Sequence, residues 1–281
     1  MYTLTDLSAG YTDHQVLKGV SLTVHDNSLF SLIGSNGSGK TTLLRVLAGL
    51  LSYTGSAALS SSELRSIPRR VFSRTVAFCM SARSFHPASA FTVREIISMS
   101  RLPYMGMFSR LSSRDNDIIS RSAEILGISH LLSRSILTLS DGQRQLVLIA
   151  SALAQDTRTI LLDEPTSSLD PDKSAQVWAL LRKLADEGRC IIAAVHDINA
   201  SMPYSHGYFA LKDGVLISHG SRLSGQVLRD LYGAEFAEYH STEVMMNCGA
   251  RCQNNIISVH TMLISRCRHT QGNITLSRAL G

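Results

Sequence analysis

The nine residues GSNGSGKTT, at positions 34 to 42, are the stretch of this sequence that decides the fold. They fit the spacing G-x-x-x-x-G-K-[ST], the P-loop pattern. In such a loop the glycines let the backbone wrap a pyrophosphate, the lysine reaches the β- and γ-phosphates, and the hydroxyl binds Mg²⁺. The predicted nucleotide site consists of Gly34, Ser35, Asn36, Gly37, Ser38, Gly39, Lys40, Thr41 and Thr42.

The residues on either side of this stretch support the same interpretation. SLFSLIG (28–34) is typical of a buried strand, and KTTLLRVLAGLL (40–51) is apolar at helical spacing. The P-loop mechanism requires a strand that leads into the glycine-rich loop and a helix that follows it. Both are expected here.

Short apolar runs alternate with helical patterns along most of the chain. The expected strands are 74–80, 158–164 and 189–195, with a hairpin over 208–220, and the expected helices are 139–155 and 172–187. This alternation predicts an α/β fold with a mostly parallel sheet and helices on both of its faces. Residues 92–133 are helical in pattern, with breaks near Pro103, and are too long for a single crossover, so we expect a separate helical lobe.

Two of the expected strands end in side chains that suit phosphate chemistry. ILLDEP (160–165) places Asp163 and Glu164 after an apolar strand, and His196 ends the next strand. A parallel sheet collects its ligands at the carboxyl ends of its strands. There the first acid could hold Mg²⁺ and the second could polarise an attacking water. A surface pair of acids and a structural histidine are the alternatives, but acids at the end of a buried strand need a partner.

A second anion site is expected at another helix start, more than 90 residues further along. LSDGQRQLVLIASALAQ (139–155) begins with a tight turn and continues as an amphipathic helix. Ser140, Asp141 and Gly142 would leave several unpaired backbone N–H groups directed outward. This second site carries no lysine.

Length and composition indicate a globular protein. The chain has 281 residues, of which 44% are apolar and 17% charged. Its longest apolar runs, such as LVLIASALA (146–154), are about half of what a bilayer span requires. No charged-then-apolar segment opens the sequence, so we expect a cytoplasmic location.

The net charge of +5 has two interpretations. A mildly basic surface is one, and attraction to the anionic cytoplasmic leaflet is the other. Nucleic-acid binding is disfavoured because no basic block or aromatic-laced stripe is present.

The five cysteines fall into two groups. Cys79 and Cys190 lie in apolar strand-like runs and are expected in the core. The second group lies near the end with two histidines; it comprises Cys248, Cys252, His260, Cys267 and His269. A metal site is one interpretation of this second group, although its spacings match no strong zinc pattern.

Together these features resemble the ATPase subunit of ABC transporters over residues 1 to about 236, with 237–281 as a tail of unassigned role. The family's signature loop is LSGGQ, and this chain has LSDGQ at 139–143. The resemblance implies a P-loop NTPase core with a mostly parallel sheet, an N-terminal antiparallel β subdomain, and an inserted α-helical subdomain over about 82–140.

The resemblance also accounts for two anion sites in one chain. It implies a homodimer in which two subunits pack head to tail, so that the signature loop of one caps the nucleotide held by the P-loop of the other. Ser140, Gly142 and Gln143 would make that contact. Asp141 departs from the family pattern, because it brings a negative charge near the phosphates.

Single residues receive roles from the same resemblance, which implies ATP and Mg²⁺ as cofactors. Tyr11 matches the aromatic residue that stacks on adenine, and Asp170 lies in a loop that links the two sites of the dimer. His196 matches the histidine that contacts the γ-phosphate. The implied catalytic residues are Lys40, Glu164 and His196, and the implied Mg²⁺ ligands are Thr41, Asp163 and, through a water, Ser81.

Residues 92–115 and 228–236 resemble the importer branch that serves ferric siderophores, haem or cobalamin. This implies integral membrane permease subunits as partners and, indirectly, a substrate-binding protein. It also implies a peripheral position on the cytoplasmic face of the inner membrane. No nucleic-acid partner is expected.

A departure at Ser81 leaves other functions open. The family has a glutamine there that touches Mg²⁺, whereas a serine hydroxyl is too short to do so without an intervening water. The first alternative is a nucleotide-binding regulatory module that turns over little ATP. The second is a soluble ABC ATPase of metal-cluster assembly, which the cysteines of the tail make conceivable.

Overall fold

The structure, a computed structural model, describes residues 1–12, 14–84, 90–106, 110–233, 235–239 and 262–266. Its chain divides into two compact units, Met1–Leu223 and Ser224–Gly281. In the second unit, helix α8 (Gly225–Tyr232) precedes an antiparallel pair, β11 (Glu235–Tyr239) and β12 (Met262–Arg266). All site residues predicted from the sequence lie in the first unit. The expected boundary near 236 stays a prediction.

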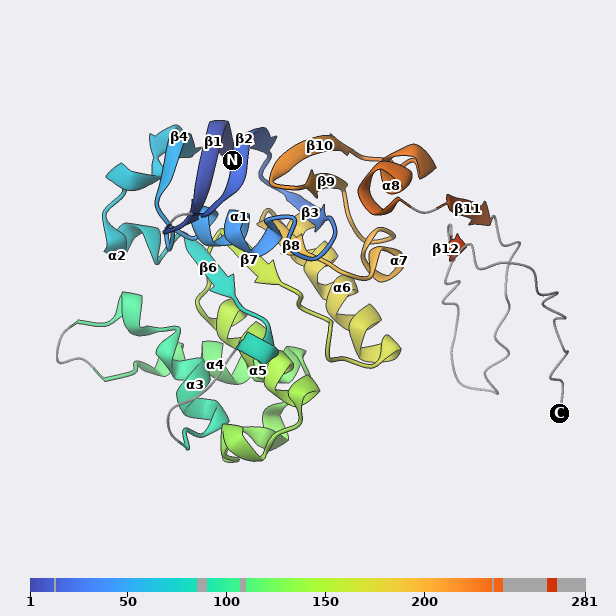
Figure 1. Cartoon of the computed structure of the whole chain (residues 1–281). Helices are drawn as coiled ribbons and strands as arrows, with labels where there is room; N and C mark the ends of the chain where they lie inside the picture. The colour runs from blue at the N-terminus through green and yellow to red at the C-terminus, as the bar shows by residue number, and fades with distance from the viewer. Residues whose placement is uncertain (13, 85–89, 107–109, 234, 240–261, 267–281) are drawn as a thin grey trace, which may run out of the picture. The chain divides into compact units, whose positions relative to one another are not determined.

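A six-stranded sheet forms the centre of the first unit (Figure 1). Its strand order is β10-β9-β3-β8-β7-β6, parallel throughout except for the β9–β10 hairpin. The strands are β3 (Ser28–Ile33), β6 (Val76–Cys79), β7 (Thr159–Asp163), β8 (Cys190–Ala194), β9 (Gly207–Lys212) and β10 (Val215–Gly220). Every residue of β7 and β8 is buried, as in a parallel sheet covered on both faces. The predicted mostly parallel sheet is confirmed.

A second sheet of four antiparallel strands precedes and follows the P-loop in the sequence. Its order is β2-β1-β4-β5. The strands are β1 (Tyr2–Tyr11), β2 (His14–Val24), β4 (Tyr53–Leu59) and β5 (Ser62–Glu63). One face of β1 is buried through Tyr2, Leu4 and Leu7, which is the pattern of a sheet with one face on the core.

Helix α1 (Lys40–Leu47) contributes to the core that joins the two sheets. Leu43 and Leu44 are buried in that core, and the Tyr2 hydroxyl donates to the Leu47 carbonyl at 3.0 Å. The expected helix over 40–51 is wrong in its last four residues. Gly49 has a φ of 66°, a left-handed conformation that ends helices and suits glycine.

Three further helices belong to the first unit, one of them in the chain between β5 and β6. They are α2 (Arg69–Phe72), α6 (Pro171–Asp186) and α7 (Ile198–Ser201). Helix α6 packs on β3 and β8 and buries Val177, Trp178 and Leu181. Its apolar residues recur at helical spacing, which is why the sequence predicted it within one residue at each end.

The helical block consists of α3 (Val93–Met99), α4 (Ser113–Ile125) and α5 (Asp141–Ala154), with α3 and α4 packed on α5. Each helix begins with a capping box, in which a Ser or Thr and the residue three positions later satisfy each other's backbone N–H. The pairs are Thr92 with Glu95, Ser112 with Asp115, and Ser140 with Gln143. A 3₁₀ turn at Leu102–Tyr104 makes the predicted break near Pro103.

A buried ion pair holds the block together. Arg101 Nε donates to Asp115 Oδ1 at 2.8 Å, and Arg101 Nη1 donates to the Ala154 carbonyl at 2.8 Å. Hydrogen bonds from Ser112 and Arg101 hold the pKa of the Asp115 carboxyl below its usual range, against the effect of burial. Because removing one partner of such a pair leaves a buried charge, this contact fixes α4 relative to the end of α5.

The two cysteines expected in the core are buried there. Burial raises the pKa of the Cys79 and Cys190 thiols to about 12. The cysteines and histidines of the tail lie outside the described residues. Within the described residues, no group of three or more His, Cys, Asp or Glu side chains could hold a metal ion. Among those same residues no helix has the length and apolarity to cross a membrane.

Candidate functional site

The P-loop connects β3 to α1 and keeps its lysine inside the loop. Lys40 is 7% exposed, and its Nζ donates to the carbonyl oxygens of Gly34 at 2.7 Å and Ser35 at 3.0 Å. Burial lowers the pKa of Lys40, and the nearby charges of Glu164 and Asp163 oppose that shift. The ammonium group is therefore held by weak neutral acceptors that phosphate oxygens could replace.

Glycine is required where the loop turns most tightly. Gly34 has a φ of 156°, and a Cβ there would collide with the Leu211 carbonyl and the Ser38 side chain. The Ser38 hydroxyl is buried without a hydrogen-bond partner, and the Ser38 carbonyl accepts from the Gly214 N–H at 3.1 Å. The turn of the β9–β10 hairpin thus supports the loop from behind. A backbone cradle with an unsatisfied hydroxyl fits a phosphate group.

A pair of oxygen ligands lies beside this cradle. The Thr41 hydroxyl donates to both carboxylate oxygens of Asp163, at 2.9 Å and 3.1 Å. Asp163 is 7% exposed, and burial raises its pKa while the Thr41 hydrogen bond opposes the rise. A hydroxyl and a buried carboxylate are hard oxygen donors, which Mg²⁺ prefers. The chemistry of these two residues fits the predicted metal site.

Ser81 lies on the neighbouring strand end. It follows β6, which pairs with β7, the strand that ends in Asp163. Ser81 is 5% exposed, and its hydroxyl accepts from the Arg83 N–H at 3.4 Å. Its contact with Mg²⁺ through a water stays a prediction.

Glu164 and His196 form a direct pair that the sequence did not predict. His196 Nε2 lies 2.7 Å from Glu164 Oε1, although the two residues were expected only at the same sheet edge. Glu164 has a φ of 51° and its N–H donates to the Ala194 carbonyl at 3.0 Å. A non-glycine residue in this region is strained, and such strain gathers at functional sites. The backbone therefore fixes the direction in which the Glu164 side chain leaves the chain, directly after Asp163.

The stretch LSDGQ (139–143), called the signature turn below, leads into α5, and its own side chains cap the start of that helix. The Ser140 hydroxyl accepts from the Gln143 N–H, and Gln143 Oε1 accepts from the Ser140 N–H, both at 3.2 Å. The expectation of unpaired N–H groups at Ser140, Asp141 and Gly142 is thus corrected for Ser140, because the capping box satisfies its N–H together with that of Gln143. The N–H groups of Asp141 and Gly142 are the first-turn donors that remain.

The signature turn packs against the loop that precedes α6. A Cβ on Gly142 would lie 2.8 Å from the Ser168 carbonyl, so only glycine fits that contact. In the same loop Asp170 caps α6, and its carboxylate accepts from the Lys173 N–H at 2.8 Å. The structure thus places Asp170 in a capping role, and its predicted role between two sites stays a prediction.

Comparison with known proteins agrees with this arrangement. A family model described as "ABC transporter" matches residues 17–167. The iron(3+)-hydroxamate import ATP-binding protein FhuC of Bacillus subtilis is 34% identical over 219 residues, covering 77% of this chain and 81% of the relative. The ferric enterobactin transport ATP-binding protein FepC of Escherichia coli is 30% identical over 232 residues, covering 81% and 85%. The chain belongs to the ABC transporter family.

A solved structure extends the likeness in fold. It is a chain of a metal-chelate type ABC transporter in an inward-facing conformation, and it matches with a TM-score of 0.77 at 24% identity, over 95% of this chain and 97% of its own. The family match at 17–167 includes the P-loop, Ser81, the signature turn and Glu164.

In this ABC protein the unusual charge of the signature turn is paired. Arg144 Nη2 donates to Asp141 Oδ1 at 2.5 Å, one helical turn away. The negative charge of Asp141 was noted from the sequence but this partner was not; it lies on the same helix face because the two residues are three positions apart. Asp141 is 60% and Arg144 27% exposed at the side chain.

We expect Arg144→Ala to lower the ATPase rate by up to about fivefold, because an exposed ion pair is worth about 0.2–1 kcal/mol and its loss leaves Asp141 uncompensated. Asp141→Gly should leave the rate unchanged. The double variant should recover the wild-type rate, and phosphate release by the four proteins measures the coupling. A double variant as slow as Arg144→Ala would show that the arginine acts independently of Asp141.

Tyr11 is accessible, as a residue that stacks on a base must be. Its side chain is 40% exposed, and its hydroxyl accepts from Arg45 Nη1 at 2.9 Å. The Arg45 guanidinium also lies 5.9 Å from the centre of the Tyr11 ring. Sequence reasoning missed Arg45, although it follows Thr41 by one turn of the P-loop helix. This contact ties the tyrosine to α1.

Proposed function

We propose that this chain is the ATPase subunit that powers import of a ferric siderophore, haem or cobalamin through a separate membrane permease. The observation that carries the ATPase assignment is the convergence of three groups at one sheet edge. They are the buried Lys40, the Thr41–Asp163 pair and the Glu164–His196 pair. Importer ATPase relatives such as FhuC and FepC support the transport assignment.

Each group has a separate task in hydrolysis. Lys40 binds the β- and γ-phosphates, and Thr41 and Asp163 would hold Mg²⁺, which neutralises phosphate charge when bound. Glu164 accepts the proton of the attacking water. His196 lies 2.7 Å from Glu164, so it can orient that carboxylate as well as contact the γ-phosphate.

The proposal includes a head-to-tail homodimer. In it, Ser140, Gly142 and Gln143 of one subunit face the nucleotide bound to the P-loop of the other, and Tyr11 stacks on adenine. The signature turn offers the Asp141 and Gly142 N–H groups for this contact. A solved dimeric ATP-binding cassette with ADP and phosphate has the same fold, with a TM-score of 0.71 at 24% identity over 80% of this chain and 100% of its own.

The assembly is peripheral, on the cytoplasmic face of the inner membrane. Permease subunits supply the membrane spans, and a substrate-binding protein delivers the chelate from the other side. Copurification with tagged chain from detergent-solubilised membranes tests this proposal. We expect an integral membrane permease among the bound proteins, and recovery without any integral membrane protein contradicts the transport assignment.

A second candidate is a regulatory ABC module that binds ATP and hydrolyses little of it. The observation that favours it is Ser81, whose buried hydroxyl bonds within its own loop. Steady-state phosphate release distinguishes the two: an ATPase turns over repeatedly, whereas a regulatory module stops after its bound ATP. For metal-cluster assembly the supporting cysteines lie outside the described residues.

We expect Ser81→Gln to raise permease-stimulated hydrolysis several-fold while ATP affinity stays near wild type. A bridging water costs about 0–2 kcal/mol compared with a direct contact, and a glutamine amide reaches about two bonds further than a serine hydroxyl. ATPase assays of both proteins with the permease present make the comparison. An unchanged or lower rate would mean that another side chain serves in place of position 81.

A further inference from the structure

Gln145 of α5, and Gln155, which directly follows α5, contact the backbone at the two ends of β6. Gln155, at the end of α5, donates through Nε2 to the carbonyl oxygens of Ser73 at 2.7 Å and Val76 at 3.0 Å. Gln145, in the first turns of α5, accepts from the Ala82 N–H at 2.7 Å. Gln155 thus contacts the residues before and at the start of β6, and Gln145 contacts a residue after its end.

Gln145 is unusual in being completely buried, with an exposed fraction of 0%. Its Oε1 accepts from Ala82, and its Nε2 lies 3.9 Å from Cys79 Sγ. Both ends of the amide are therefore used within the core. Loss of this side chain would leave the Ala82 N–H buried without a partner, which costs more than an ordinary surface hydrogen bond.

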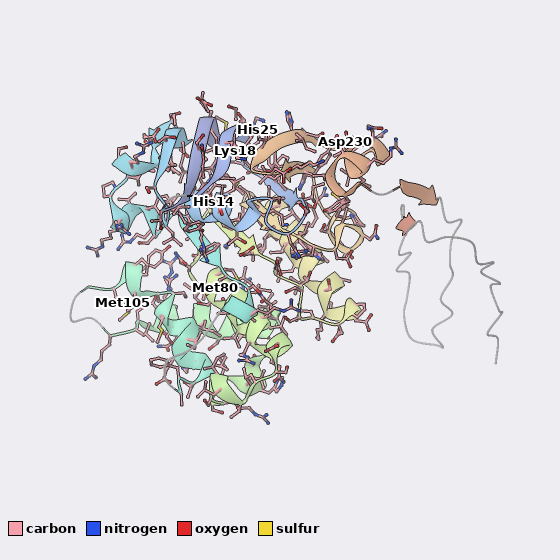
Figure 2. All side chains as sticks on the ribbon, in the orientation of Figure 1. His14, Lys18, His25, Met80, Met105 and Asp230 are labelled. Atoms are coloured by element: carbon pink, nitrogen blue, oxygen red, sulfur yellow. The ribbon has the colours of Figure 1, made fainter. Side chains whose placement is uncertain are left out.

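The backbone that Gln145 contacts lies near the edge of the sheet where Asp163 ends β7 and Glu164 follows it. Ala82 directly follows Ser81, and β6 pairs with β7, which ends in Asp163. Asp163 is also near enough to add to the effect of burial in raising the pKa of Cys79 to about 12. Figure 2 marks Met80, where the chain leaves β6 and enters the helical block.

Gln145 itself lies in α5, the helix that begins at the signature turn. Gln145 follows Gln143 of the capping box by two residues, within the same first turns of α5. The Ser81 hydroxyl bonds to the Arg83 N–H of its own loop and does not make this link. Gln145 thus joins the backbone after β6 to the first turns of α5, the helix that the signature turn begins.

We propose that Gln145 is a positioning residue for ATP hydrolysis, which fixes the loop after β6 to the signature helix so that both move as one body. This inference rests on the proposed ATPase function. Gln145 touches no P-loop residue among its hydrogen bonds, and Lys40 and Thr41 bind nucleotide without it. Its loss therefore lowers kcat and leaves the KM for ATP unchanged.

The test compares Gln145→Met with Gln155→Met. Each substitution removes a side-chain amide, buried at 145 and half-buried at 155, and keeps the length of the side chain. We expect Gln145→Met to lower kcat about tenfold, which corresponds to about 1.4 kcal/mol of activation free energy, with KM within twofold of wild type. Gln155→Met should melt at a similarly reduced temperature but keep the wild-type kcat. Equal kcat values for the two variants overturn the proposal.

Two further measurements test the contact between Gln145 and Ala82 directly. Gln145→Glu retains an acceptor of the same length, and burial keeps its carboxyl protonated and neutral. Its kcat should therefore exceed that of Gln145→Met. If the methionine variant does not fold, Gln145→Asn takes its place in this comparison. No recovery in Gln145→Glu overturns the role of the Ala82 contact. Amide hydrogen exchange of residues 80–84 should be faster in Gln145→Met and not in Gln155→Met. If the wild-type chain hydrolyses no ATP, the proposed function fails, and exchange at 80–84 still tests the contact.

Discussion

Replacing Glu164 by glutamine is expected to lower kcat for ATP hydrolysis by about 100-fold or more while ATP binding persists. Glutamine has nearly the same shape as glutamate but cannot accept the proton of the attacking water. Lys40 and the Thr41–Asp163 pair are unchanged, so nucleotide and Mg²⁺ still have their ligands. Phosphate release and equilibrium binding of labelled ATP measure the two effects separately.

The matched control is Glu187→Gln, which makes the same substitution on an exposed residue at the end of α6. It should leave kcat unchanged. If Glu164→Gln keeps more than about a tenth of the wild-type rate, the carboxylate is not the general base, because such catalysis is worth about 100-fold or more. His196 would then be the candidate to examine, because it is paired with Glu164 at 2.7 Å.

Two inactive variants, Lys40→Ala and Ser140→Arg, are expected to recover activity when mixed. Lys40 belongs to the P-loop of one subunit, and Ser140 to the signature turn that faces the other subunit's nucleotide. In a mixed dimer both lesions fall on one composite site, and the second site is intact. We expect each variant alone to lose nearly all turnover, and the mixture to recover a measurable fraction of the wild-type rate.

Lys40→Ala mixed with Glu164→Gln is the control for this experiment. Both lesions then lie on the P-loop side of their own subunits, so each composite site carries one lesion and no site is intact. This mixture should stay inactive. Recovery in both mixtures, or in neither while all variants fold, contradicts the head-to-tail arrangement.

Much of the fold and the P-loop could be predicted because the signals are local. The spacing of Gly34, Gly39 and Lys40 determines the loop, and helical or strand periodicity determines the flanking elements. The end of α1 was misplaced because apolar residues continue past Gly49, whose left-handed backbone ends the helix.

The contacts that sequence could not predict involve side chains from distant segments. Glu164 and His196 are 32 positions apart, and Gln145 reaches Ala82 from 63 positions away. Only the register of neighbouring strands and the packing of α5 bring such residues together. The Asp141–Arg144 pair is different, because its helical spacing was visible in the sequence and could have been inferred.

The mass of the Glu164→Gln variant with and without Mg·ATP tests the central claim most directly. That claim is that two copies of this chain enclose ATP between the P-loop of one and the signature turn of the other. With ATP we predict twice the chain mass of 30.6 kDa and one bound ATP for each chain, and without ATP a mass of 30.6 kDa. A variant that binds ATP fully and stays at the mass of one chain would contradict the account.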